Sequence, residues 1–78
     1  MQTFHIEASW DAEAEVWVAT SDDVPGLVTE AASIEALAHK LRVLVPELLE
    51  ANGVVQGDTS ALSFELTSHR HESIRLAS

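Results

Sequence analysis

The chain has 78 residues, enough for one domain, and no cysteine, which excludes disulfides and thiolate metal sites. Thirteen acidic residues against four basic ones give a formal charge of −9, which disfavours unaided binding to nucleic acid. No apolar stretch approaches the ~20 residues of a membrane-spanning helix, and the N-terminus lacks a basic leader. We therefore expect a cytoplasmic protein that binds neither membranes nor nucleic acid directly.

The beginning of the chain alternates between apolar and polar residues, as a half-buried strand does. Over residues 3–9 the apolar positions share one face: Phe4, Ile6 and Ala8. Residues 15–20 form a second strand in which both alternating sets are apolar. We predict that Val16 and Val18 face the core, which places Trp17 on the opposite, uncovered face. There it would either anchor a partner or stack on a neighbouring side chain, such as that of Trp10.

The sequence Val24-Pro25-Gly26 predicts a sharp turn. Proline presets φ at the first central position, and glycine accepts the positive φ that a type II turn needs next. The turn reverses the chain into a third, antiparallel strand over residues 27–31. Asp22 and Asp23 come just before this turn, where water would solvate their charges.

A single amphipathic helix should follow, with Ser33 as its N-cap. Its apolar residues recur at three- and four-residue spacing: Ile34, Leu37, Leu41, Leu44, Val45, Leu48 and Leu49. Asn52-Gly53 ends the pattern in the usual manner. Pro46 lies inside it and predicts a kink, or a second short helix with Pro46 in its first turn.

The end of the chain alternates again over residues 61–67, with Leu62, Phe64 and Leu66 on one face. We assign residues 1–68 to the domain and residues 69–78 to a C-terminal arm or strand extension. Unpaired backbone groups at a strand end invite pairing with another chain. The arm residues proposed for oligomerisation are His69, His71, Ile74 and Leu76.

These elements predict an α+β fold of order β-β-β-α-β, in which a mainly antiparallel sheet carries one helix on one face. The last strand should lie parallel to the first or the third through a right-handed crossover. One helix covers one face only, so the other face is expected to stay open. It would carry His5, Glu7, Trp17, Glu65 and Thr67.

Signals for catalysis or cofactor binding are weak. There is no glycine-rich phosphate loop and no nucleophile elbow. His69 and His71 would share a face of a strand, but a metal site normally needs a third ligand, and the sequence nominates none. We expect no catalytic residue, metal or cofactor, and the protein is predicted not to be an enzyme.

Three segments together resemble the HicB-like antitoxin superfamily. They are Trp17-Val18-Ala19, Asp23-Val24-Pro25-Gly26 and Val28-Thr29-Glu30-Ala31, followed by the helix opened at Ser33. The resemblance covers about residues 4–51 and implies a partial ribonuclease-H-like fold. It also implies binding to a small basic RNA-cleaving toxin. Typical members carry a C-terminal DNA-binding segment that the tail of this chain does not match, so operator binding is not implied.

Two functions remain open. In the first, the protein is a non-catalytic antitoxin-like module, with Asp22, Asp23 and Glu30 as the charges and Trp17 as the anchor that meet a basic toxin. In the second, it is a stand-alone oligomerising domain with a structural or small-ligand role, and the acids only keep it soluble. A homodimer or higher homo-oligomer is expected in both cases.

Overall fold

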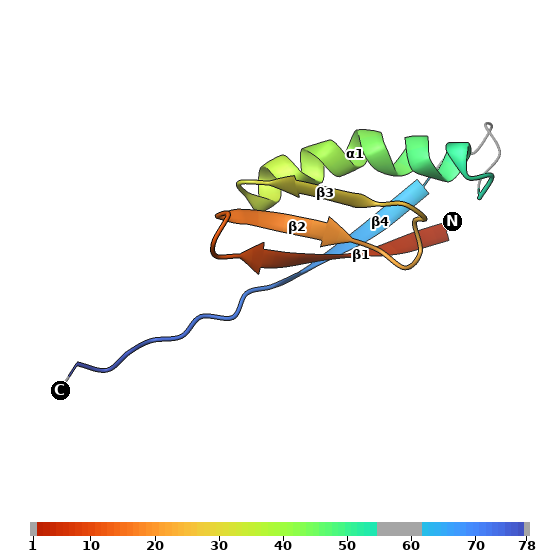
Figure 1. Ribbon diagram of the computed structural model, residues 1–78. Coiled ribbons are helices and arrows are strands. Elements are labelled where there is room, and N and C mark those ends of the chain that lie inside the picture. The colour runs from red at the N-terminus through yellow and green to blue at the C-terminus, as the bar shows by residue number, and fades with distance from the viewer. Residues whose placement is uncertain (1, 55–61, 78) are drawn as a thin grey trace.

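The computed structural model describes residues 2–54 and 62–77. Its elements are β1 (Gln2–Asp11), β2 (Val16–Thr20), β3 (Val28–Ala31), α1 (Ile34–Ala51) and β4 (Leu62–His69). Figure 1 shows the strands in one layer with α1 packed on one face, so the α+β class and the β-β-β-α-β order are confirmed.

The strands form one mixed sheet in the order β3-β2-β1-β4. β2 pairs antiparallel with both β1 and β3. β4 pairs parallel with β1, which decides between the two positions predicted for it. The helical crossover thus brings the chain to the far side of β1, so β3 and β4 are the two edges of the sheet.

Both ends of α1 are capped as predicted. Ser33 has extended backbone angles, and its Oγ accepts a hydrogen bond from the Ala36 N–H at 3.1 Å. At the other end Gly53 adopts φ +70°, and its N–H donates to the Glu50 carbonyl. The Val54 N–H donates to the Leu49 carbonyl, which completes a Schellman motif.

The helix continues through Pro46, so the prediction of a second helix starting there is wrong. Val45 and Leu49 flank the proline, and both are buried against the sheet. The free energy gained by burying this apolar stripe offsets the cost of the hydrogen bond that proline cannot donate.

The turn before β3 has the predicted form. Gly26 adopts φ +80°, and the Leu27 N–H donates to the Val24 carbonyl at 3.2 Å. The side-chain amide of Asn52 donates to the Pro25 carbonyl at 3.3 Å, which ties this turn to the C-terminal end of α1.

The core lies between α1 and the sheet. Its buried apolar residues are Phe4, Ile6, Ala8, Ala19, Val24, Leu27, Ala31, Leu37, Leu41, Val45 and Leu49. Phe4, Ile6 and Ala8 face the helix as predicted. Because three buried positions of the sheet are alanines, the helix can approach its backbone closely there.

The predicted facing of β2 is wrong. Ala19 lies directly opposite Ala8, and Trp17 lies opposite Trp10, so Trp17 and Ala19 share the helix-covered face. Val18 lies opposite Ser9 and Val16 lies opposite Asp11, so both valines are on the open face. The core here needs a small side chain beneath the helix, and Ala19 supplies it with no exposed surface.

Candidate functional site

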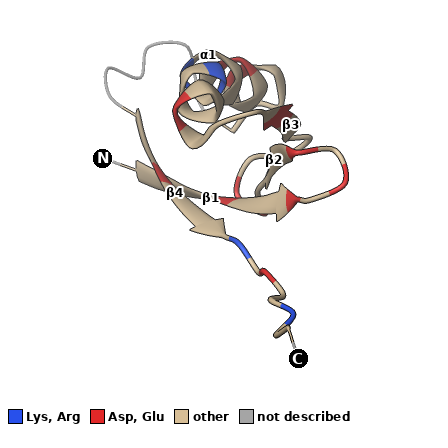
Figure 2. Cartoon of the chain, turned by 90° about the vertical axis from the view of Figure 1, so that its left-hand side faces the viewer, with Lys and Arg blue, Asp and Glu red and all other residues tan. Residues whose placement is uncertain are grey.

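The open face of the sheet, which α1 does not cover, is polar and acidic. The strand registers place four carboxylates on it: Glu7, Asp11, Glu30 and Glu65. Among the described residues, this face carries no lysine or arginine, only His5 and His69 as cationic candidates. His5, Glu7, Glu65 and Thr67 lie on this face as predicted, and Trp17 does not. In Figure 2 acidic residues also mark the turns at the sheet's ends.

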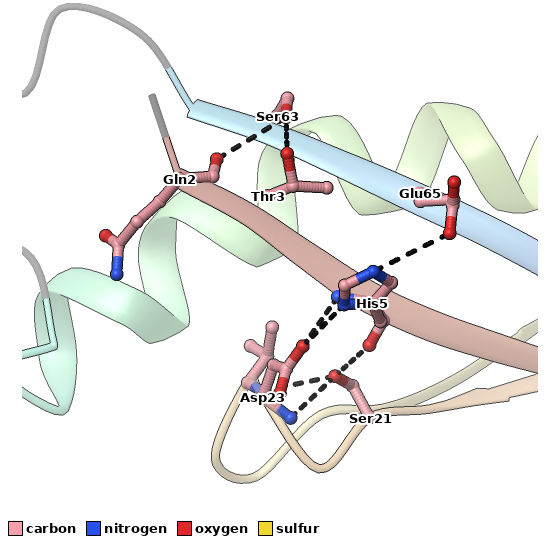
Figure 3. Close-up of polar contacts among 8 residues, drawn as sticks. Gln2, Thr3, His5, Ser21, Asp23, Ser63 and Glu65 are labelled. Carbon is pink, nitrogen blue, oxygen red and sulfur yellow. Dashed lines mark hydrogen bonds and ion pairs between the residues drawn. The ribbon is translucent and has the colours of Figure 1, made fainter.

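A polar network joins the start of the open face to the turn before β3 (Figure 3). The backbone N–H of His5 donates to Asp23 Oδ2 at 2.8 Å, and His5 Nδ1 lies 3.2 Å from the same oxygen. The hydroxyl of Ser21 donates to the His5 carbonyl and accepts from the Asp23 N–H at 3.0 Å. The turn is therefore fastened to β1 by side chains as well as by its own backbone.

The two neighbouring aspartates thus differ in role. Both are exposed, as expected, but Asp23 also binds β1. The hydrogen bond from the His5 backbone N–H, followed by the one from the His5 side chain, holds the pKa of Asp23 below its usual value of 3.8. Asp22 is exposed and makes no side-chain hydrogen bond within the described part of the chain, so it does not fasten the turn.

Replacing Asp23 with asparagine is expected to lower the urea midpoint of unfolding at pH 7. Because the folded state lowers the pKa of Asp23, its charged form stabilises the fold above the unfolded-state pKa, and this contribution is lost as pH falls through the folded-state pKa. The difference between wild type and variant should therefore shrink as pH falls from 5 towards 2. The matched control is Asp22→Asn, for which a similar loss would contradict the assigned roles.

Further pairs cross from β1 to β4. His5 Nε2 lies 3.6 Å from Glu65 Oε1, and His69 Nε2 lies 3.3 Å from Glu7 Oε1. All four side chains are more than half exposed, so each pair contributes little to stability even with the histidine protonated. Their consequence is positional, since they hold two carboxylates in place on the open face.

The hollow beside this network is shallow. It is lined by His5, Glu7, Thr20, Ser21, Asp22 and Asp23, and its volume is about 200 Å³. Pockets for small molecules usually span roughly 300–1,000 Å³ and are mostly apolar. The small volume of this hollow favours contact with a partner's surface over enclosure of a small ligand at this position.

The described ranges show no group of three histidine, aspartate or glutamate side chains placed to hold a metal ion. Within the same ranges, no helix combines the length and the apolar character that crossing a bilayer requires.

The residues predicted to contact a partner are not all brought together. Asp22 and Asp23 lie at the turn, Glu30 lies on the open face, and Trp17 lies on the helix-covered face. The ring of Trp17 is 5.3 Å from that of Trp10, and the Arg70 guanidinium lies 4.2 Å above Trp10. Contact between Trp17 and Trp10 is the alternative that the sequence leaves open, and the structure shows it. The sequence does not predict Arg70 here, because its position depends on the register that places it beyond Trp10.

The residues predicted for oligomerisation lie at the C-terminal end. His69 is the last residue of β4, whereas His71, Ile74 and Leu76 belong to an exposed segment without regular structure. We call residues 70–77 the arm. In Figure 1 it runs away from the body of the domain.

Comparison with known proteins identifies a family without an assigned activity. Residues 3–78 match the model described as Domain of unknown function (DUF1902). The crystal structure of the hypothetical protein TTHA1013 from the extremely thermophilic bacterium Thermus thermophilus is similar, with 51% sequence identity and a TM-score of 0.72. That match covers 96% of this chain and 100% of the other. No curated protein matches the chain.

Proposed function

We propose that this chain, which belongs to the DUF1902 family, is a non-catalytic protein-interaction module that neutralises a small basic RNA-cleaving toxin. The observation that carries the proposal is the open face, with its four carboxylates and, in the described ranges, no lysine or arginine. The motifs that resemble HicB-like antitoxins supply the class of partner. Such a toxin acts on RNA, so the proposed compartment is the cytoplasm.

The exposure of the acids supports recognition of a basic surface. Glu7 is 67% exposed and Glu65 is 64% exposed, so both can reach a partner without rearrangement. Like-signed charges spread over one face produce a field that accelerates encounter with an oppositely charged protein. A basic partner that binds this face would have its RNA-binding surface covered. The negative field of the face would also repel RNA.

The test is co-purification from the native cell with the tagged full chain. A small basic protein is expected to co-purify, and its RNA cleavage should stop when the complex is rebuilt. Replacing Glu7, Glu30 and Glu65 together with glutamine should slow association at low salt by about 10-fold, within the range typical of electrostatic steering. The wild-type rate should also fall as salt shortens the screening length from ~30 Å to ~8 Å.

A matched control removes the same number of charges from α1. Glu35, Glu47 and Glu50 are exposed on the helix, and their replacement with glutamine changes the net charge equally. This variant should associate nearly as fast as wild type. Equal slowing by both variants, or a co-purified partner without basic character, would contradict the assignment to the open face.

The alternative, a stand-alone oligomerising domain, is favoured by a different observation. Ile74 and Leu76 of the arm are 86% and 87% exposed, which is unusual for two large apolar residues so close together. In this second proposal the acids serve solubility alone. The native-cell experiment distinguishes the two, because a purely oligomerising domain would bring down no toxin.

A further inference from the structure

The helix layer ends before it reaches β4. Phe4 and Ile6 of β1 are 4% and 0% exposed, but Phe64 and Leu66, which lie directly beside them in the register, are only half-buried. Leu62 is half-buried as well. A partly uncovered apolar stripe therefore runs along an edge strand that has no outer neighbour in the described sheet.

The other edge of the sheet is less suited to pairing. β3 spans only Val28–Ala31, and the ammonium group of Lys40 donates to the backbone carbonyl of Glu30 at 2.6 Å. Short edge strands and lysines beside them are recognised means of discouraging strand addition. Eight-residue β4 is thus the more accessible edge.

The arm continues the pattern of β4. Ile74 and Leu76 have the same parity as Phe64 and Leu66, so in an extended chain they share one face. The arm contributes to a longest molecular dimension of 61 Å, against 20 and 19 Å in the other directions. Its apolar residues match the β4 stripe in chemistry and spacing.

The chain is poorly built to fold its own arm back onto β4. Such a hairpin would turn within residues 68–72, a stretch without glycine, proline, asparagine or aspartate. Arg70 stacks on Trp10 at 4.2 Å, and its Nε donates to Glu72 at 2.7 Å. These contacts hold the arm's first residues away from a tight turn.

We infer that the arm pairs antiparallel with β4 of a second copy of this chain, and that the second copy's arm pairs with β4 of the first. With Arg70 at the two-fold axis, Leu66 faces the partner subunit's Ile74. In the same register, Phe64 faces the partner subunit's Leu76. Exchange between identical strands closes as a two-fold dimer and leaves no repeating edge.

Charge complementarity supports this occupant. Two arginines and one glutamate give the arm a formal charge of +1, which leaves −10 for the rest of the chain. Each arm would therefore lie on a body of opposite charge. This inference goes beyond the proposed function and does not depend on it, because edge pairing leaves the acidic open face of each copy free.

Disulfide trapping tests the register, since the natural chain has no cysteine. The full-length variant Leu66→Cys/Ile74→Cys, treated with oxidised glutathione, is expected to run mainly as a covalent dimer on a non-reducing gel. Directly opposed residues of antiparallel strands have Cβ atoms about 4.5–5.5 Å apart, close enough for a disulfide after small adjustments. Each single-cysteine variant should stay monomeric on the same gel, because neither residue faces the same residue of the second copy.

A second pair guards against a variant that fails to fold. Phe64→Cys/Leu76→Cys probes the neighbouring step of the same register and should give the same dimer. The matched control Thr67→Cys/Ile74→Cys moves one thiol to the opposite face and should cross-link far less. An intrachain disulfide would show that the arm folds back on its own β4, and free thiols in a folded protein would show that it pairs with nothing. Either result overturns the inference.

Discussion

Replacing Ala19 with lysine is expected to unfold the protein at room temperature, whereas the same change at neighbouring Val18 should leave it folded. Ala19 has no exposed surface beneath α1, and a lysine there would overpack the core and bury an unpaired charge. Such changes exceed about 4 kcal/mol, comparable with a total stability of about 4–12 kcal/mol for a domain of this length.

Val18 provides the matched control because it lies on the open face, directly opposite Glu30. A lysine there can pair with that carboxylate and also reduces the net negative charge. The measurement is thermal unfolding of both variants by circular dichroism. If Val18→Lys unfolded and Ala19→Lys melted like wild type, the two faces of β2 would be reversed.

Replacing both Ile74 and Leu76 with aspartate is expected to leave the chain monomeric, in contrast to the dimer inferred for the wild type, without lowering the stability of the monomer fold. Each side chain is almost fully exposed within one chain, so the body does not depend on it. In the dimer both would lie against half-buried Phe64 and Leu66 of the partner subunit. Loss of two apolar contacts per arm should weaken association by at least about 100-fold.

The control for that variant places the same charges on the other side of the arm. Ser73 and Ala77 are also exposed, and their parity is opposite to that of the apolar pair. Replacing both with aspartate should weaken association much less. Sedimentation velocity over a concentration series measures both effects. Equal weakening by the two variants would mean that charge alone, and not the apolar stripe, controls association.

Much of the fold could be predicted because several local signals agree with the tertiary structure. Ser33 and Gly53 bound the helix as expected, and Gly26 has the positive φ that its turn required. The alternation in β1 also gave the correct buried face, since its polar and apolar sets differ clearly. Pro46 shows the limit of such signals, because packing of the helix on the sheet outweighs its local effect.

The facing of β2 could not be predicted in the same way. Valine, tryptophan and alanine make both of its faces apolar, so periodicity alone gives two solutions. The structure selects the one that places Ala19 beneath the helix, a choice that depends on the space between layers. The alternation in the sequence therefore predicts the wrong face for Trp17.

Only part of the candidate site could be predicted from the sequence. The acidic bias was visible, but the bond between His5 and Asp23 joins residues 18 positions apart and depends on how the turn returns to β1. The stacking of Arg70 on Trp10 likewise requires β4 to lie parallel to β1. Such contacts follow from topology, which local patterns determine only indirectly.

The mass of the unaltered chain in solution tests the exchange of arms most directly. Light scattering at micromolar concentration is expected to give twice the 8.5 kDa of a single chain. A mass of 8.5 kDa that persists when the protein concentration is raised by more than about 100-fold would contradict paired arms. It would also leave the exposed Ile74 and Leu76 without the partner inferred for them.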